Sequence, residues 1–177
     1  LGNFRSNNLH GGGSARISVN KDNIFGSIRY SHQQFGDYNV PADSFDYNFF
    51  RLPIIDRTLK NTAGEERNIS GFAGILRSWG LTRLDVSYYS LDVGLFSGAV
   101  GIPRSYAFTD DGNNREIDEP RQSVRHLKAV LSQEVFLRDH QVLHLHFGFQ
   151  ENIRREFSFP EFHSMPFVDP SNTLALE

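Results

Sequence analysis

Four side chains with metal-binding chemistry lie in the C-terminal half of the chain. His144 and His146 are two residues apart and so share one face of a strand, while His126 and Glu134 fall on the polar face of the preceding predicted strand. Imidazoles at this spacing can converge on one ion, such as zinc. The competing interpretation, which the sequence favours, is four ordinary polar residues that face water, so no metal ligand is assigned.

A second candidate is the acidic segment 110–119. Its carboxylates could supply oxygen ligands for Ca²⁺, which often stiffens long external loops. The segment does not have the spacing of the twelve-residue calcium loop, and Asp111-Gly112 is a common turn signal. The pattern therefore favours a plain loop over a calcium site. The acidic residues are Asp110, Asp111, Glu116, Asp118 and Glu119.

A third candidate is an unusually aromatic stretch that could form a platform for a ligand. Packing of a long loop on itself would explain the same residues, and we favour that explanation. No residue here is assigned as a binding residue. The stretch contains Tyr38, Phe45, Tyr47, Phe49, Phe50 and Arg51.

Other chemistries are excluded or left without support by the sequence. The chain has no cysteine, which removes disulfides, thiolate metal sites and a cysteine nucleophile. Gly11-Gly12-Gly13 lacks the following Lys-Ser/Thr of a phosphate loop, and no Gly-x-Ser-x-Gly elbow occurs. A formal net charge of −3 gives no reason to expect nucleic-acid binding. We therefore expect no enzyme activity and no cofactor.

The elements that would position these residues are strands. Sixteen Phe and six Tyr against one Met favour an all-β fold. Alternation of apolar and polar residues predicts strands at about 14–19, 24–32, 68–77, 81–92, 123–137 and 142–157, and 173–177 could open another. Within 142–150 the odd-numbered residues are Leu or Phe, whereas the even-numbered ones include both histidines. Such alternation fits a lipid-facing barrel and a soluble sandwich equally.

The connections between these strands alternate in length. Short turns are predicted at 20–23, 78–80 and 138–141, and long loops at about 33–67, 93–122 and 158–172. All seven prolines lie in the long loops. Tight turns at one end and long loops at the other are normal in outer-membrane barrels. Tyr30, Trp79, Tyr88 and Tyr89 lie near strand ends and suit an interfacial aromatic girdle.

Several further segments stand out along the chain: 35–43 (FGDYNVPAD), 59–64 (LKNTAG), and the hairpin at 78–80 (SWG) that leads into 93–96 (VGLF) and 101–103 (GIP). In their order and spacing these segments resemble the barrel of TonB-dependent outer-membrane receptors, particularly those of Bacteroidetes-like bacteria. The resemblance implies a 22-strand transmembrane barrel with an N-terminal plug. It also implies uptake of a scarce nutrient such as a metal chelate, cobalamin or glycan, driven by the TonB complex through the plug.

The chain is then expected to be a fragment. Residues 1–177 would be a partial barrel domain, an antiparallel up-and-down meander of about six to seven strands, without the plug. Its expected partners are outer-membrane lipid, an unknown nutrient ligand and, through the missing plug, the TonB complex. Two other classes stay open: a soluble β-sandwich whose long loops bind a partner, and a cupin-like metal enzyme that uses His144, His146 and a third ligand.

Overall fold

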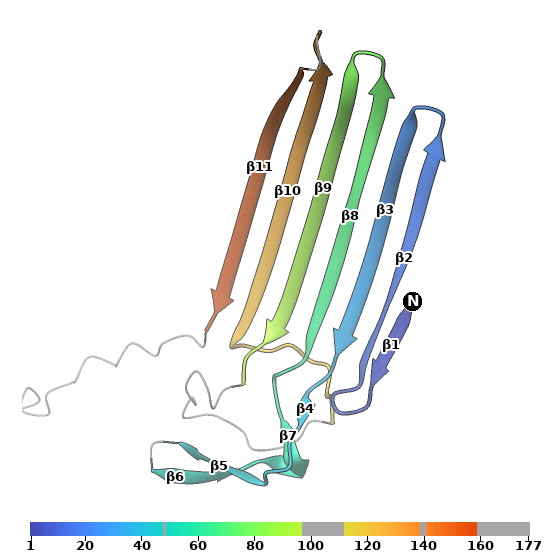
Figure 1. Ribbon diagram of the computed structural model, residues 1–177. Coiled ribbons are helices and arrows are strands. Elements are labelled where there is room, and N and C mark those ends of the chain that lie inside the picture. The colour runs from blue at the N-terminus through green and yellow to red at the C-terminus, as the bar shows by residue number, and fades with distance from the viewer. Residues whose placement is uncertain (48, 97–111, 139–140, 159–177) are drawn as a thin grey trace, which may run out of the picture.

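The computed structural model describes residues 1–47, 49–96, 112–138 and 141–158, and these form an all-β, antiparallel meander (Figure 1). One seven-stranded sheet contains strands in the order β1-β2-β3-β8-β9-β10-β11. In the described ranges the helical structure is limited to a 3-10 turn, η1, at Ile55–Arg57. The strands are β1 Gly2–Arg5, β2 His10–Lys21, β3 Ile24–Phe35, β8 Gly64–Arg77, β9 Gly80–Gly94, β10 Arg121–Phe136 and β11 Val142–Phe157.

The strand predictions are confirmed at all six alternating segments from 14–19 to 142–157. The seventh segment, 173–177, lies outside the described residues. The sheet has a seventh strand elsewhere: β1, which pairs with the Gly11–Gly13 part of β2 and which alternation does not predict. The main sheet therefore has seven strands, as expected for the fragment, but the seventh strand is β1 and not the segment 173–177.

The tight turns lie together at one end of the sheet (Figure 1). Asp22 and Asn23 join β2 to β3, and Ser78 and Trp79 join β8 to β9. Backbone bonds link each turn to the end of the next strand in the sheet: the Phe136 amide of β10 donates to the Trp79 carbonyl at 2.8 Å, and the Leu76 amide of β8 donates to the Asn23 carbonyl at 2.8 Å. Residues 139–140 of the third turn are outside the described ranges. The predicted turns at 20–23 and 78–80 are confirmed.

The opposite end carries the longer connections, and the first of them is shorter than predicted and contains short strands. Strands β3 and β8 take up both ends of the predicted 33–67 loop, which leaves 36–63. This connection contains two small ladders, β4 Tyr38–Asn39 with β7 Thr58–Leu59 and β5 Ser44–Tyr47 with β6 Phe50–Pro53. A tight turn at 6–9 between β1 and β2 also lies at this end, so the expected segregation is not complete. Residues 97–111 of the predicted 93–122 loop, and 159–172 of the predicted 158–172 loop, lie outside the described residues.

Cross-strand register divides the large sheet into two chemically different faces. Residues that pair across strands project to the same side, so rows of partners can be followed through the sheet. One such row runs Tyr30, Ile69, Tyr88, Leu127. The side with this row is the apolar face, and it includes Ile17, Val19, Ile28, Leu84, Val86, Leu131, Leu143, Leu145, Phe147 and Phe149.

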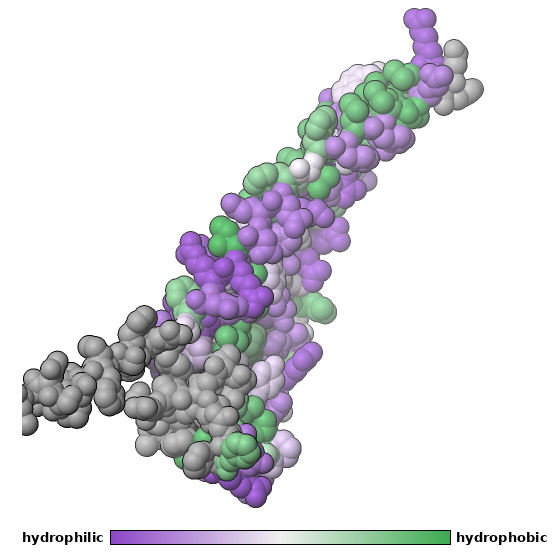
Figure 2. Space-filling view, turned by 90° about the vertical axis from the view of Figure 1, so that its left-hand side faces the viewer, coloured by the Kyte–Doolittle hydropathy of each residue, from purple (hydrophilic) through white to green (hydrophobic). Residues whose placement is uncertain are grey.

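The apolar face is open in the described part of the chain. The buried hydrophobic core there consists of Ala63 alone, whereas Ile17 is 68% and Phe147 is 61% exposed. Figure 2 views the molecule from the β11 side and shows a narrow slab with hydrophobic residues at its surface. The sheet ends in two free edges, β1 and β11, so the described strands form no closed barrel. The same ranges contain no helix with the length and hydropathy needed to span a bilayer.

Candidate functional site

The polar face carries a trough of about 570 Å³ near the middle of the sheet. Five neighbouring strands line it, from β2 to β10. Its polar-face side chains come from two adjacent cross-strand rows, and one of these rows carries the three cations of the lining. This row consists of Arg16, Arg29, Ser70, Ser87 and Lys128. Four spacings between neighbouring strands make this row about 19 Å wide.

Serine hydroxyls hold the two arginines of the row. Arg16 Nε donates to Ser27 Oγ at 2.6 Å, and Ser18 Oγ also donates to Ser27 Oγ, at 3.0 Å. Arg29 Nη2 donates to Ser14 Oγ at 3.3 Å. A neutral hydroxyl fixes a guanidinium without cancelling its charge, so both arginines stay available to an anion.

Asp85 is the carboxylate in the described lining of the trough, and Arg83 binds it. Arg83 Nε lies 2.9 Å from Asp85 Oδ2 and Nη2 lies 2.6 Å from Oδ1, which is the bidentate geometry of an arginine with a carboxylate. The Arg83 guanidinium also lies 4.3 Å from the centre of the Phe72 ring. Asp85 is therefore neutralised locally and does not neutralise the row of Arg16 and Arg29.

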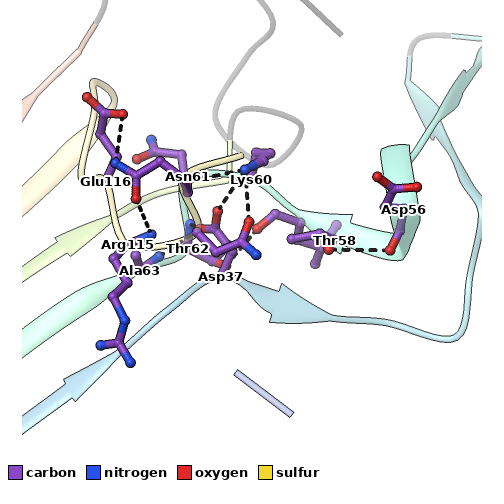
Figure 3. Close-up of polar contacts among 12 residues, drawn as sticks. Asp37, Asp56, Thr58, Lys60, Asn61, Thr62, Ala63, Arg115 and Glu116 are labelled. Atoms are coloured by element: carbon purple, nitrogen blue, oxygen red, sulfur yellow. Dashed lines mark hydrogen bonds and ion pairs between the residues drawn. The ribbon is translucent and has the colours of Figure 1, made fainter. Parts of the chain in front are cut away.

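A buried polar network ties the bases of the loops together at the other end of the molecule (Figure 3). The Asp37 side chain is 2% exposed, and its Oδ1 accepts bonds from the amides of Thr62 at 2.8 Å and Ala63 at 3.1 Å. Lys60 Nζ lies 3.8 Å from Asp37 Oδ2 and donates to Asn114 Oδ1 at 2.9 Å. The network thus joins the connection after β3 to the segment before β10.

Asn61 extends this network to the neighbouring strands. Its Nδ2 donates to the carbonyls of Leu95 at 3.0 Å and Pro120 at 2.8 Å, directly after β9 and directly before β10. Its Oδ1 accepts from the Asp118 amide at 2.9 Å. One amide side chain therefore satisfies three backbone groups of the 93–122 connection, and Asn61 does so in a left-handed conformation with φ 60.

The histidine cluster is only partly assembled. His144 pairs with Glu134 across β10 and β11, with 3.4 Å between Nδ1 and Oε1, and His146 Nδ1 lies 3.0 Å from Ser132 Oγ. His126 pairs with Asn152 instead, eight residues along β10 from Glu134, which is about 26 Å. Including His126 in one site with His144 and His146 was wrong. The described residues contain no group of three potential metal ligands.

The acidic segment and the aromatic stretch also fail to form compact sites in the described residues. Asp110 and Asp111 lie outside these ranges, while Glu116 accepts a bond from Asn113 Nδ2 at 3.4 Å. In the aromatic stretch, Phe45 packs edge-on against Phe96 with 5.1 Å between ring centres, whereas Phe49 is fully exposed. Tyr38 is half exposed, Arg51 Nε donates to Ser44 Oγ, and the side chains of Tyr47 and Phe50 are outside the described set.

The aromatic residues expected near strand ends do not all lie on the same face of the sheet. Tyr30 and Tyr88 belong to one row of the apolar face, and Trp79 lies half exposed in the β8–β9 turn. Tyr89 pairs with Asn68 and His126 and lies on the polar face, so its assignment to the same girdle was wrong.

Comparison with known proteins does not assign the chain to a family. No protein-family model matches the chain, and neither the curated proteins nor the solved structures give a match.

The sequence analysis did not predict the row of Arg16, Arg29 and Lys128 or the network around Asp37. The pairs within each hairpin could have been found by following the register from the predicted turn, which places Arg16 opposite Arg29 and Ser70 opposite Ser87. The Asp37 network joins segments that are far apart in the chain, so it gives no periodic pattern in the sequence.

Proposed function

We propose that this chain forms part of the wall of an outer-membrane β-barrel of the TonB-dependent receptor class. Its apolar face would contact lipid and its polar face would line a water-filled lumen. The observation that carries the proposal is a single-layer sheet with an exposed apolar face across strands of 12 to 16 residues, β2, β3 and β8 to β11. A tilted strand needs only about 9–11 residues to cross a bilayer.

The apolar face has a defined boundary on the loop side, which supports the same assignment. The row that contains Tyr30 and Tyr88 ends the apolar band, and the next row toward the loops contains His32 and Arg67. Glu65 lies beyond that row and accepts from both His32 and Arg67. Tyrosines at the edge of an apolar band, followed by charged residues, fit the interface between hydrocarbon and headgroups.

The loop end provides the third line of support. The segments 35–43 and 59–64, which carry the resemblance to TonB-dependent receptors, contribute Asp37, Lys60, Asn61 and Thr62 to the network at the loop bases. In a receptor these loops would face outward and would contribute to capture of a scarce nutrient, a metal chelate, cobalamin or glycan. Energy for uptake would come from the TonB complex through a plug domain encoded upstream.

A soluble β-sandwich binding module is the second candidate, and the exposed apolar face argues against it. A sandwich covers this face with a second sheet about 10 Å away. The described residues supply only the four short strands β4 to β7 outside the main sheet, and these lie at its loop end (Figure 1). A cupin-like enzyme is less well supported, because His144 and His146 gain no third ligand within the described residues.

Cell fractionation tests the proposal. An antibody raised against the chain should detect the native gene product in the outer-membrane fraction, where it should resist extraction with alkaline carbonate. The reading frame upstream of Leu1 should encode a plug domain and a signal peptide. A carbonate-soluble or cytosolic product, or an upstream stop codon, would contradict the assignment.

A further inference from the structure

We propose that the polar-face trough binds a ligand that carries an oxyanion, with Arg16 and Arg29 as the residues that contact it. The chemical class is a phosphate, sulfate or carboxylate on a body that bears hydroxyl groups. This inference rests on the proposed function in one respect only, namely that the polar face lines the path of the transported ligand.

The first argument is the pairing of two like charges. Arg16 and Arg29 are direct partners in the β2–β3 ladder, so their Cβ atoms lie about 5 Å apart. Like charges directly opposite each other in a ladder are destabilising. Among the described residues, neither arginine has a carboxylate within ion-pair distance. Arg16 bonds to Ser27 and Arg29 bonds to Ser14, one row to either side of this pair, so both side chains would turn inward to share an oxyanion, which would then offset the repulsion.

The second argument is the charge of the whole trough. Lys128 adds a third cation at the far end of the row and likewise lacks a carboxylate partner within the part of the chain that the structure describes. Asp85 is occupied by Arg83. The charged residues of the described lining sum to +2, from Arg16, Arg29 and Lys128 less Asp85, in a chain whose formal net charge is −3. Concave surfaces lined by one sign of charge concentrate ligands of the opposite sign.

The third argument is the distribution of hydrogen-bonding groups between the cations. Ser70 and Ser87 lie between Arg29 and Lys128 in the same row. Each hydroxyl can donate and accept, which suits a hydroxyl-bearing ligand body rather than a bare inorganic ion. Three strand spacings separate Arg29 from Lys128, about 14 Å, so the ligand would extend across the strands.

The test is a calorimetric titration of the full 177-residue chain in detergent micelles with glucose 6-phosphate, glucose and inorganic phosphate. Glucose 6-phosphate should bind, glucose should bind at least about tenfold more weakly, and inorganic phosphate should lie between them. Arg16→Gln and Arg29→Gln should each weaken glucose 6-phosphate binding by about tenfold or more, since each removes a charged hydrogen-bond partner. Raising the salt concentration should weaken binding further.

The matched control is Arg154→Gln. Arg154 lies on the same face but binds Glu156, at the end of β11 away from the trough, so its loss should leave the affinity unchanged. Equal binding of glucose and glucose 6-phosphate overturns the proposal, as does unchanged affinity in either arginine variant or an equal loss in the control. Circular dichroism of each variant separates lost binding from lost folding, and Arg16→Lys provides a second, milder variant. Fractionation reports on the barrel assignment separately.

Discussion

Replacing Leu131 by arginine should destabilise the chain in lipid far more than replacing its neighbour Val130. Both residues are aliphatic and adjacent in β10, but Leu131 is on the apolar face opposite Leu84, whereas Val130 is on the polar face opposite Asp85 and Gly148. A Cβ at Gly148 would meet no atom within 4 Å, so the polar side has room for a longer side chain.

The magnitude follows from the position of Leu131 in the apolar band. It lies midway between Leu127, in the row with the tyrosines, and Val135, in the ladder position opposite Gly80. Each half of this interval is about 13 Å along the strand. Leu131 would thus lie near the bilayer midplane, where an arginine costs about 2–4 kcal/mol. The unfolding equilibrium should shift by about 30- to 700-fold, while Val130→Arg should stay within about 0.5 kcal/mol of the parent.

The assay is guanidinium unfolding of the chain in phospholipid vesicles, followed by the fluorescence of the single tryptophan, Trp79. A second measurement distinguishes lipid from a protein core. Because the chain has no cysteine, Leu131→Cys and Val130→Cys can each carry one bimane label. Nitroxide lipids should quench the label at Leu131, and aqueous iodide should quench the label at Val130. Equal destabilisation by the two arginines would refute the reasoning, as would a label at Leu131 that neither quencher reaches.

Two further substitutions test the loop base and the turn. Asp37→Ala leaves the amides of Thr62 and Ala63 without their acceptor and should cost about 1–3 kcal/mol, seen as faster hydrogen exchange at those two amides while the strands stay protected. Gly80→Ala should destabilise the chain by about 1–3 kcal/mol, because Gly80 has φ +155 and a Cβ there would overlap the β10 backbone. Gly148→Ala, in open space, is the matched control, and an equal loss in thermal stability would contradict this explanation.

The strands were predictable where their two faces differ in polarity. From 142 to 150, Leu or Phe alternates with polar residues, so the period of two locates β11 directly. The loop-side end of β8 could not be found this way, because Glu65, Glu66 and Arg67 are charged on both faces. Strand β1 has only four residues and pairs with Gly11–Gly13, which have low strand propensity, so local sequence gives no signal for it.

The candidate sites were predictable only as far as register could be inferred. The alternation of side chains along a strand correctly placed His144 and His146 on one face. Alternation gives no information about distance along the strand, and His126 lies far from the other two histidines. The Asp37 network depends on contacts between the connection after β3 and the segment before β10. These contacts form only when the strands of the sheet have come together, and no local sequence pattern indicates them. They could therefore not be predicted from the sequence.

The placement of Asn61 has a consequence for how the loops can change during evolution. It fixes the chain directly after β9 and directly before β10, at the base of the connection and not at its tip. The Asp118 amide, which also bonds to Asn61, lies between these two anchor points, so the described contacts of Asn61 all fall close to the ends of the two strands. We therefore expect changes in loop length beyond these anchor points to be tolerated better than the loss of Asn61, because Asn61 fixes the two strand ends independently of the loop between them.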